Sequence, residues 1–230
     1  MKKIFVMVLS FSAFLVSCSS PYYPEYRPVV SLGANTSALV CENDENTCSL
    51  NVISNMAYTA SIISGTEWLS FTDTDDTVRH GSGNTVLTFN HLANNHDKRV
   101  AYLVLAAESR RDTIRIKQKG QFEDFLEMHP EDKDKYLTME NGTRLMVPES
   151  GGSYSIRLKT SRLDHEIKCW TDNPNSVVDF NVENKVLSFR VKQNVSGQPL
   201  FINIELSYID GWDDKQTYTF SIRQQFDPLN

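Results

Sequence analysis

Short runs of alternating apolar and polar residues follow one another along most of the chain. In residues 113–117, Thr-Ile-Arg-Ile-Lys, the isoleucines share one face and the charged side chains the other. A period of two is typical of half-buried β-strands, and clusters of Asn, Asp, Gly and Ser separate the runs. In the first half we predict about seven strands and no long helix, with the strands around residues 38–40, 50–53, 58–62, 68–71, 86–89, 102–105 and 113–116.

The second half has the same rhythm after one interruption. In residues 121–135, Phe122, Phe125, Leu126 and His129 fall at helical spacing and predict a short amphipathic helix that ends before Pro130. We interpret this segment as a linker whose apolar face rests on a neighbouring sandwich. Strands are then predicted around residues 144–147, 153–158, 166–170, 177–180, 186–189, 201–206 and 218–222.

The two halves also repeat in sequence. NTVLTF at residues 84–89 returns as NKVLSF at 184–189, and Ile-Lys-Gln at 116–118 returns as Ile-Arg-Gln at 222–224. The second interval is longer, and its extra residues fall in the loop around residues 209–215. Two matches in the same order indicate a duplicated domain. The predicted fold is therefore all-β, with two tandem β-sandwiches at residues 36–120 and 136–226.

The N-terminus has the pattern of a secretory signal. Two lysines follow Met1, an apolar run extends to Val16, and the segment ends Leu-Val-Ser-Cys18. The apolar run is shorter than the roughly 20 residues that span a bilayer. The ending resembles the lipobox of bacterial lipoproteins, which implies a signal peptide at residues 1–17, a lipid on Cys18 and an outer-membrane location with its face undetermined. An ordinary export signal with a coincidental cysteine is the alternative.

Residues 18–35 and the charge balance add two expectations. The segment after Cys18 is rich in Pro and Tyr and predicts an extended tether. The chain has 23 Lys and Arg against 29 Asp and Glu, a formal net charge of −6. An acidic chain argues against nucleic-acid partners and against electrostatic docking on anionic lipid, so the membrane contact is expected through the lipid anchor.

The remaining cysteines differ in their surroundings. Cys41 and Cys48 flank a polar hexapeptide, and a hairpin with Asp44 and Glu45 at its loop would place them opposite each other in one ladder. Because exported proteins meet an oxidising compartment, we predict a Cys41–Cys48 disulfide. Cys169 is predicted to be a buried thiol. Trp68 and Trp170 stand in predicted strands and are assigned to the core.

Several motifs of the first half occur in an order known from one family. They are NMAYTAS (55–61), EWLS (67–70), GSGN (81–84), NNHDKRVA (94–101) and IRIKQKG (114–120). Together they resemble the BACON domain (Bacteroidetes-associated carbohydrate-binding often N-terminal), with a Tyr where Trp is commoner. The second half keeps the paired glycines at 151–152 and the two repeated motifs, but it lacks the Trp-Leu pair and the Arg-x-Ala step, so it resembles a diverged BACON or other immunoglobulin-like copy.

This resemblance implies immunoglobulin-like sandwiches and a glycan-binding role. The expected function is a non-catalytic accessory lipoprotein in glycan handling, with a polysaccharide or an envelope protein as partner. The alternative is a structural spacer or protein-interaction scaffold that binds no glycan. No G-x-S-x-G, H-E-x-x-H or glycosidase-type carboxylate pair is present, and the acidic loops lack EF-hand spacing. We therefore expect no enzyme, no metal site and no cofactor.

One candidate binding site follows from the aromatic residues. Asp210-Gly211 is a strong hairpin-turn signal and is followed by Trp212 and Asp213. The faces of aromatic rings attract the C–H groups of sugars, and such a site needs polar neighbours. We therefore predict that Trp212, with Tyr208, Asp210 and Asp213, contacts a ligand. In the alternative, Trp212 folds back on its own sheet or on the linker.

Overall fold

A computed structural model describes residues 29–138 and 144–226. The predicted signal peptide, Cys18 and most of the tether lie outside these residues, so their assignment stays a prediction. Within the described ranges, no helix has the length and apolar character needed to cross a membrane.

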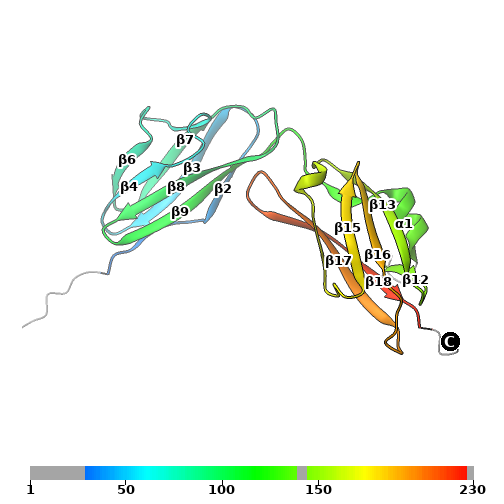
Figure 1. The fold of residues 1–230 in the computed structure, drawn as a ribbon. Helices are drawn as coiled ribbons and strands as arrows, with labels where there is room; N and C mark the ends of the chain where they lie inside the picture. The colour runs from blue at the N-terminus through cyan, green and yellow to red at the C-terminus, as the bar shows by residue number, and fades with distance from the viewer. Residues whose placement is uncertain (1–28, 139–143, 227–230) are drawn as a thin grey trace, which may run out of the picture.

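The first sandwich packs two sheets face to face (Figure 1). The four-stranded sheet has the order β1 (Leu32–Ala34), β3 (Asn46–Ser54), β7 (Thr85–His91) and β5 (Leu69–Phe71). The five-stranded sheet has the order β2 (Ala38–Cys41), β9 (Arg110–Gln118), β8 (Arg99–Ala107), β4 (Ala57–Ile62) and β6 (Val78–Ser82). All pairs are antiparallel except β2 with β9, which run parallel.

The second sandwich repeats this plan. Its four-stranded sheet has the order β10 (Leu126–Met128), β13 (Gly152–Thr160), β16 (Val186–Val191) and β15 (Val177–Glu183). Its five-stranded sheet has the order β11 (Leu137–Thr138), β12 (Arg144–Val147), β18 (Lys215–Gln224), β17 (Leu200–Ile209) and β14 (Lys168–Thr171). Strands β12 and β18 are parallel, as β2 and β9 are in the first sandwich. The chain is thus all-β with an immunoglobulin-like sandwich fold, as predicted.

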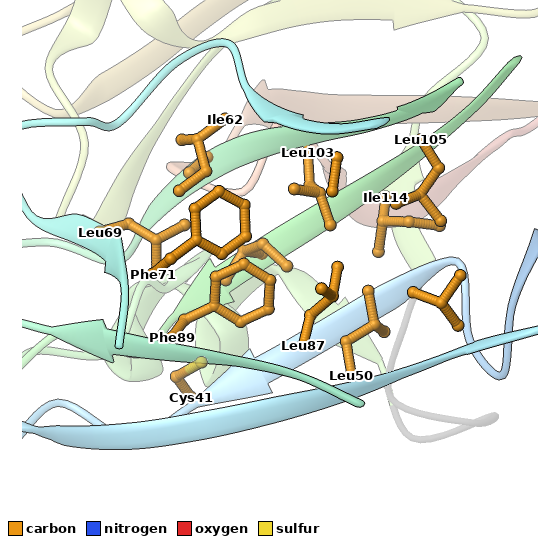
Figure 2. Close-up of a cluster of buried hydrophobic side chains, with 14 of the residues drawn as sticks. Cys41, Leu50, Ile62, Leu69, Phe71, Leu87, Phe89, Leu103, Leu105 and Ile114 are labelled. Carbon is orange, nitrogen blue, oxygen red and sulfur yellow. The ribbon is translucent and has the colours of Figure 1, made fainter. Parts of the chain in front are cut away.

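Each sandwich encloses its own hydrophobic core. In the first, Leu87 and Phe89 of β7 face Leu103 of β8 and Ile114 of β9 (Figure 2). The second core is built in the same way from β13, β16, β17 and β18, and it shares no residue with the first. The alternating pattern places these side chains inside because every second residue of a strand points to the same face. Two separate cores mean that each half buries its own apolar surface.

The repeat seen in the sequence has a structural counterpart. NTVLTF and NKVLSF end up in β7 and β16, the second strand from one edge of their sheets. Asn94 and Asn194, one hundred positions apart, are both buried after these strands. Each side-chain amide donates two hydrogen bonds to backbone carbonyls, at 2.8 and 3.0 Å for Asn94 and at 2.8 and 3.1 Å for Asn194. Asn194 extends the repeat beyond the motifs that the sequence comparison used.

The predicted helix is wrong in position. Residues 121–125 are irregular and Leu126–Met128 form β10, which pairs with β13 of the second sandwich. The helix α1 (Pro130–Tyr136) begins at the proline instead of ending before it. Proline suits the first turn of a helix because its missing N–H has no intrahelical partner there. The linker between the sandwiches is therefore shorter than predicted, and the second sandwich starts at Leu126.

The disulfide joins the two sheets of the first sandwich. Cys41 and Cys48 are bonded, with Cα atoms 6.1 Å apart. Cys41 lies in β2, which pairs with β9, whereas Cys48 lies in β3, which pairs with β1 and β7. The predicted hairpin is therefore wrong, because the chain crosses from one sheet to the other between the two cysteines. The bond thus links the edge strand β2 of the five-stranded sheet to β3 of the four-stranded sheet.

Removal of this disulfide should destabilise the first sandwich. The bonded cysteines are 7 positions apart, and closing so short a loop lowers unfolded-state entropy by an amount worth about 2.5 kcal/mol. We expect the double substitution Cys41→Ala/Cys48→Ala to lower the free energy of unfolding by that amount in urea denaturation. Cys169→Ala is the control for loss of a sulfur. A double variant as stable as the unsubstituted chain would contradict the expectation.

Candidate functional site

The hairpin between β17 and β18 reaches the first sandwich, as Figure 1 shows, and its tip is residues 210–214. Trp212 of this tip is half-buried, and its indole Nε1 donates a hydrogen bond of 2.9 Å to the backbone carbonyl of Gln118. The ammonium groups of Lys98 and Lys117 lie 4.8 and 5.2 Å from the ring centroid. Such cation–π contacts hold the ring against the first sandwich. We call this contact between the hairpin tip and the first sandwich the joint.

Asp210 organises the tip and binds across the joint. Its buried carboxylate accepts hydrogen bonds from the backbone N–H groups of Trp212 (2.8 Å) and Asp214 (3.0 Å). The other oxygen accepts from the amide of Gln216 (2.8 Å) and lies 2.9 Å from Lys98 Nζ. Burial alone would raise the pKa of Asp210, but these donors outweigh it and lower the pKa. Asp210 is therefore a charged group held inside the joint.

Two further acids of the tip contact the outer face of β8 and β9. The carboxylate of Asp214 binds the guanidinium of Arg115 at 2.6 Å and the ammonium of Lys117. These hydrogen bonds, first from Lys117 and then from Arg115, lower the pKa of Asp214. Asp213 accepts a hydrogen bond from the hydroxyl of Tyr102. An acidic loop thus meets a basic surface within one chain.

A buried ion cluster connects the linker to both sandwiches. Asp124 of the linker forms an ion pair with Arg162 of the second sandwich, and Lys98 Nζ lies 3.1 Å from its other oxygen. The guanidinium of Arg162 lies 5.2 Å from the ring centroid of buried Tyr208. The side chains of Asp124 and Arg162 are 4% and 9% exposed. Since buried charges are costly unless paired, this cluster requires the linker and both sandwiches to be in place.

The four predicted ligand residues therefore gather at the joint. Trp212, Asp210 and Asp213 bind the first sandwich, and Tyr208 lies beneath Arg162. The polar groups of Trp212, Asp210 and Asp213 are engaged by partners from the same chain, so the structure assigns these residues to the contact between sandwiches. The alternative, in which Trp212 folds back on its own sheet or on the linker, is right that the protein covers the ring but wrong about the cover, which is the first sandwich. A pocket of about 310 Å³ remains beside the ring, lined by Lys98, Lys119, Gly120, Phe122, Glu123, Asp124 and Trp212.

Trp170 points outward, contrary to its assignment to the core. It is 56% exposed, whereas Trp68 is 3% exposed and belongs to the first core as predicted. Trp170 stands on β14, the edge strand of the five-stranded sheet of the second sandwich, directly opposite Glu205 of β17. The neighbouring Cys169 points inward and is partly buried. Burial raises the pKa of the Cys169 thiol to about 11.

A row of polar side chains lies beside Trp170 on the same outer face. Asn203 Nδ2 donates to a carboxylate oxygen of Asp172 at 2.7 Å, and the Ser221 hydroxyl donates to Asn203 Oδ1 at 2.8 Å. Asn203 and Ser221 are paired positions of β17 and β18. The row thus fixes the orientation of the hydroxyl of β18, the amide of β17 and the carboxylate of Asp172, which directly follows β14.

A second exposed ring lies beyond the polar row. Phe201 is 59% exposed, and the guanidinium carbons of Arg144 and Arg223 lie 5.5 and 5.9 Å from its ring centroid. We call this surface the β14 face; it consists of Arg144, Trp170, Asp172, Phe201, Asn203, Glu205, Ser221 and Arg223. It presents two aromatic rings, with hydrogen-bonding groups between them and two cations at one end. Such a surface can hold an extended ligand that has both apolar and polar faces.

One cluster of potential metal ligands occurs among the described residues. The ligand atoms of Cys41, Cys48 and His91 lie within 4.8 Å of one another. Thiolates are the metal-binding form of cysteine, and these two sulfurs are joined in the disulfide. The ring of His91 instead contacts the side-chain amide of Gln118 at 3.1 Å. The three side chains are therefore bonded to protein groups at the edge of the first hydrophobic core.

Comparisons with known proteins find likeness only at the level of structure. No family model and no curated protein matches the chain. A chimeric titin Z1Z2 tandem is 7% identical, with a TM-score of 0.41, and the match covers 86% of this chain and 100% of the tandem. The Pseudomonas aeruginosa CupB2 chaperone is 10% identical, with a TM-score of 0.34 and coverage of 82% and 99%.

A third solved structure is a Bacteroides ovatus GH5 xyloglucanase in complex with a XXXG heptasaccharide. It is 14% identical with a TM-score of 0.33, and the match covers 40% of this chain but only 19% of the enzyme. At these identities and TM-scores the comparisons carry no argument about what this chain binds.

Proposed function

We propose that this chain is a non-catalytic accessory lipoprotein of the outer membrane, of BACON type, that binds glycan on the β14 face. The observation that carries the proposal is the exposure of Trp170 beside an ordered row of polar groups. A large apolar ring exposed to water is unfavourable unless a partner covers it. Pyranose rings fit such a surface because their C–H faces stack on aromatic rings while their hydroxyls exchange hydrogen bonds with neighbouring side chains.

Trp170→Ala should abolish most of this binding. Loss of a central aromatic anchor costs about 2 kcal/mol of binding free energy, which is about a thirtyfold loss of affinity. We would measure retardation of the purified full-length chain in gels containing neutral and acidic plant and host polysaccharides. Phe122→Ala is the matched control, because Phe122 is an exposed ring that lines the pocket beside the joint.

The outcomes of this measurement are distinct. Retardation lost in Trp170→Ala and kept in Phe122→Ala supports the β14 face. The reverse pattern moves the site to the pocket beside Trp212. Retardation of neither the unsubstituted chain nor the variants by any polysaccharide would refute glycan binding.

A structural spacer is the second candidate, and the joint favours it. Asp210, Trp212 and Asp214 all bind the first sandwich, so the two sandwiches have a fixed contact rather than a free linker. Two sandwiches in fixed contact would keep a set position relative to each other and hold a partner away from the lipid anchor predicted at Cys18. The two candidates are compatible, since a rigid arrangement also keeps the β14 face at a fixed orientation.

A further inference from the structure

We propose that the glycan bound on the β14 face is anionic, and that Arg144 and Arg223 bind its carboxylate or sulfate groups beside Phe201. This inference rests on the proposed function and specifies the chemistry of the ligand. It concerns the end of the β14 face farthest from the joint, because Phe201 lies near the start of β17 and the hairpin tip follows its end.

Two arginines gather around Phe201. Phe201 pairs with Arg223 on β18, and Arg144 lies on β12 opposite Ser221. Both guanidinium groups lie within 6 Å of the same ring centroid, at 5.5 and 5.9 Å. Two like charges held at one ring repel each other, and an anion placed between them would relieve that repulsion. Guanidinium groups match carboxylates and sulfates with paired N–H donors.

Among the described residues, neither Arg144 nor Arg223 forms an ion pair with any carboxylate. The acids on the same face are already engaged, since Glu205 binds Lys215 at 2.6 Å and Asp172 binds Asn203. The two arginines thus form a basic site on a chain of formal net charge −6. A site of opposite sign to the whole chain indicates a partner with local negative charge.

The rings of Trp170 and Phe201 are spaced along one face of the sheet. Phe201 and Glu205, the residue opposite Trp170, are four positions apart on β17 and therefore on the same face. At about 3.3 Å per residue, the two ring positions are separated by about 13 Å along the strand. A chain of several sugars would cross the polar row of Asn203 between its two stacking positions. An acidic polysaccharide supplies apolar sugar faces for both rings and an anion for the arginines.

The test compares polymers that differ in charge alone. Polygalacturonate would be set against its fully methyl-esterified form, and dextran sulfate against dextran, by affinity electrophoresis of the purified full-length chain. We expect at least one charged polymer to bind about tenfold more tightly than its neutral counterpart. The two pairs distinguish carboxylate from sulfate as the anion. Equal binding within both pairs would overturn the anionic assignment and leave glycan binding in place, whereas no binding to any polymer would overturn both.

Substitution of the two arginines tests whether they cause the preference for charged polymers. Arg144→Gln/Arg223→Gln should remove the preference for the charged polymer, about tenfold, and keep any binding to the neutral one. The matched control is Arg110→Gln/Arg111→Gln, which removes the same charge from the exposed start of β9 in the first sandwich. Equal losses in both double variants, or binding of oligo-dT as tight as that of the polysaccharides, would overturn the proposal in favour of nonspecific attraction of polyanions.

Discussion

Asp210→Ala should separate the two sandwiches. The side chain is 0% exposed and binds Lys98 across the joint while it accepts three hydrogen bonds within the β17–β18 hairpin. Removal of one partner from a buried ion pair costs about 3–5 kcal/mol, because the other charge is left without compensation. We expect a larger radius of gyration in small-angle X-ray scattering and faster proteolysis of the linker at residues 121–125.

Asp210→Asn is the informative companion. The amide oxygen can still accept from the backbone N–H groups of Trp212 and Asp214, but the charge that binds Lys98 is gone. We expect this variant to open the joint while the hairpin tip keeps its turn. A scattering profile unchanged in both variants would show that the ion pair does not hold the sandwiches together.

The same groups give the joint a dependence on pH. The pKa values of Asp210 and Asp214 are lower in the folded chain than the ordinary value of 3.8. The stabilisation is therefore fully present above that value and is lost as the pH falls through the lower folded values. Acid should open the joint of the unsubstituted chain, and Asp210→Asn should already be open at neutral pH.

Gly211→Ala should have a comparably large effect through sterics alone. A methyl group at position 211 would overlap the backbone carbonyl of Lys98 and touch the stem of its side chain. Because the first obstacle is backbone, relief requires the hairpin tip to move away from the first sandwich. We expect the radius of gyration from small-angle X-ray scattering to increase, while the second sandwich keeps its own thermal stability.

Gly33→Ala is the control for an added methyl group. The nearest atom to a methyl at position 33 is a carboxylate oxygen of Asp112 at 3.7 Å, an ordinary contact. This variant should scatter like the unsubstituted chain. If Gly211→Ala behaved in the same way as Gly33→Ala, the close approach of the two backbones at the joint would be refuted.

The strands and the repeat could be predicted because they depend on local pattern. Alternation in residues 113–117 placed Ile114 and Ile116 in the core, and the same holds for Leu187 and Phe189 in the second half. The disulfide partners followed from their proximity in sequence. The sheets in which the two cysteines lie could not be predicted. The same spacing of Cys41 and Cys48 fits both a hairpin and a chain that crosses from one sheet to the other.

The site was harder to predict, and Trp170 and Trp212 show why. Lys168 and Trp170 are two positions apart in β14, so their side chains point to the same face of the sheet. A lysine is normally exposed, and it therefore indicated that Trp170 also points outward. That signal was outweighed by the apolar character of tryptophan. The cover of Trp212 comes from Lys98, Lys117 and Gln118, about a hundred positions away, and no local pattern contains that contact.

The joint and the β14 face lie at different parts of the second sandwich. The joint uses the tip of the β17–β18 hairpin, and the β14 face uses the outer side of the same two strands nearer their other ends. A substitution in one should therefore leave the other intact, since the sites share no side chain. Trp212 therefore serves contact within the chain, and Trp170 remains open to a partner.

Oxidation of the tryptophans by N-bromosuccinimide, followed by peptide mass spectrometry, tests this claim without any ligand. The full-length chain should be oxidised first at Trp170, more slowly at Trp212 and last at Trp68, in the order of their exposure. Oxidation of Trp212 as fast as that of Trp170 would contradict the covered joint, and protection of Trp170 would remove the proposed binding face.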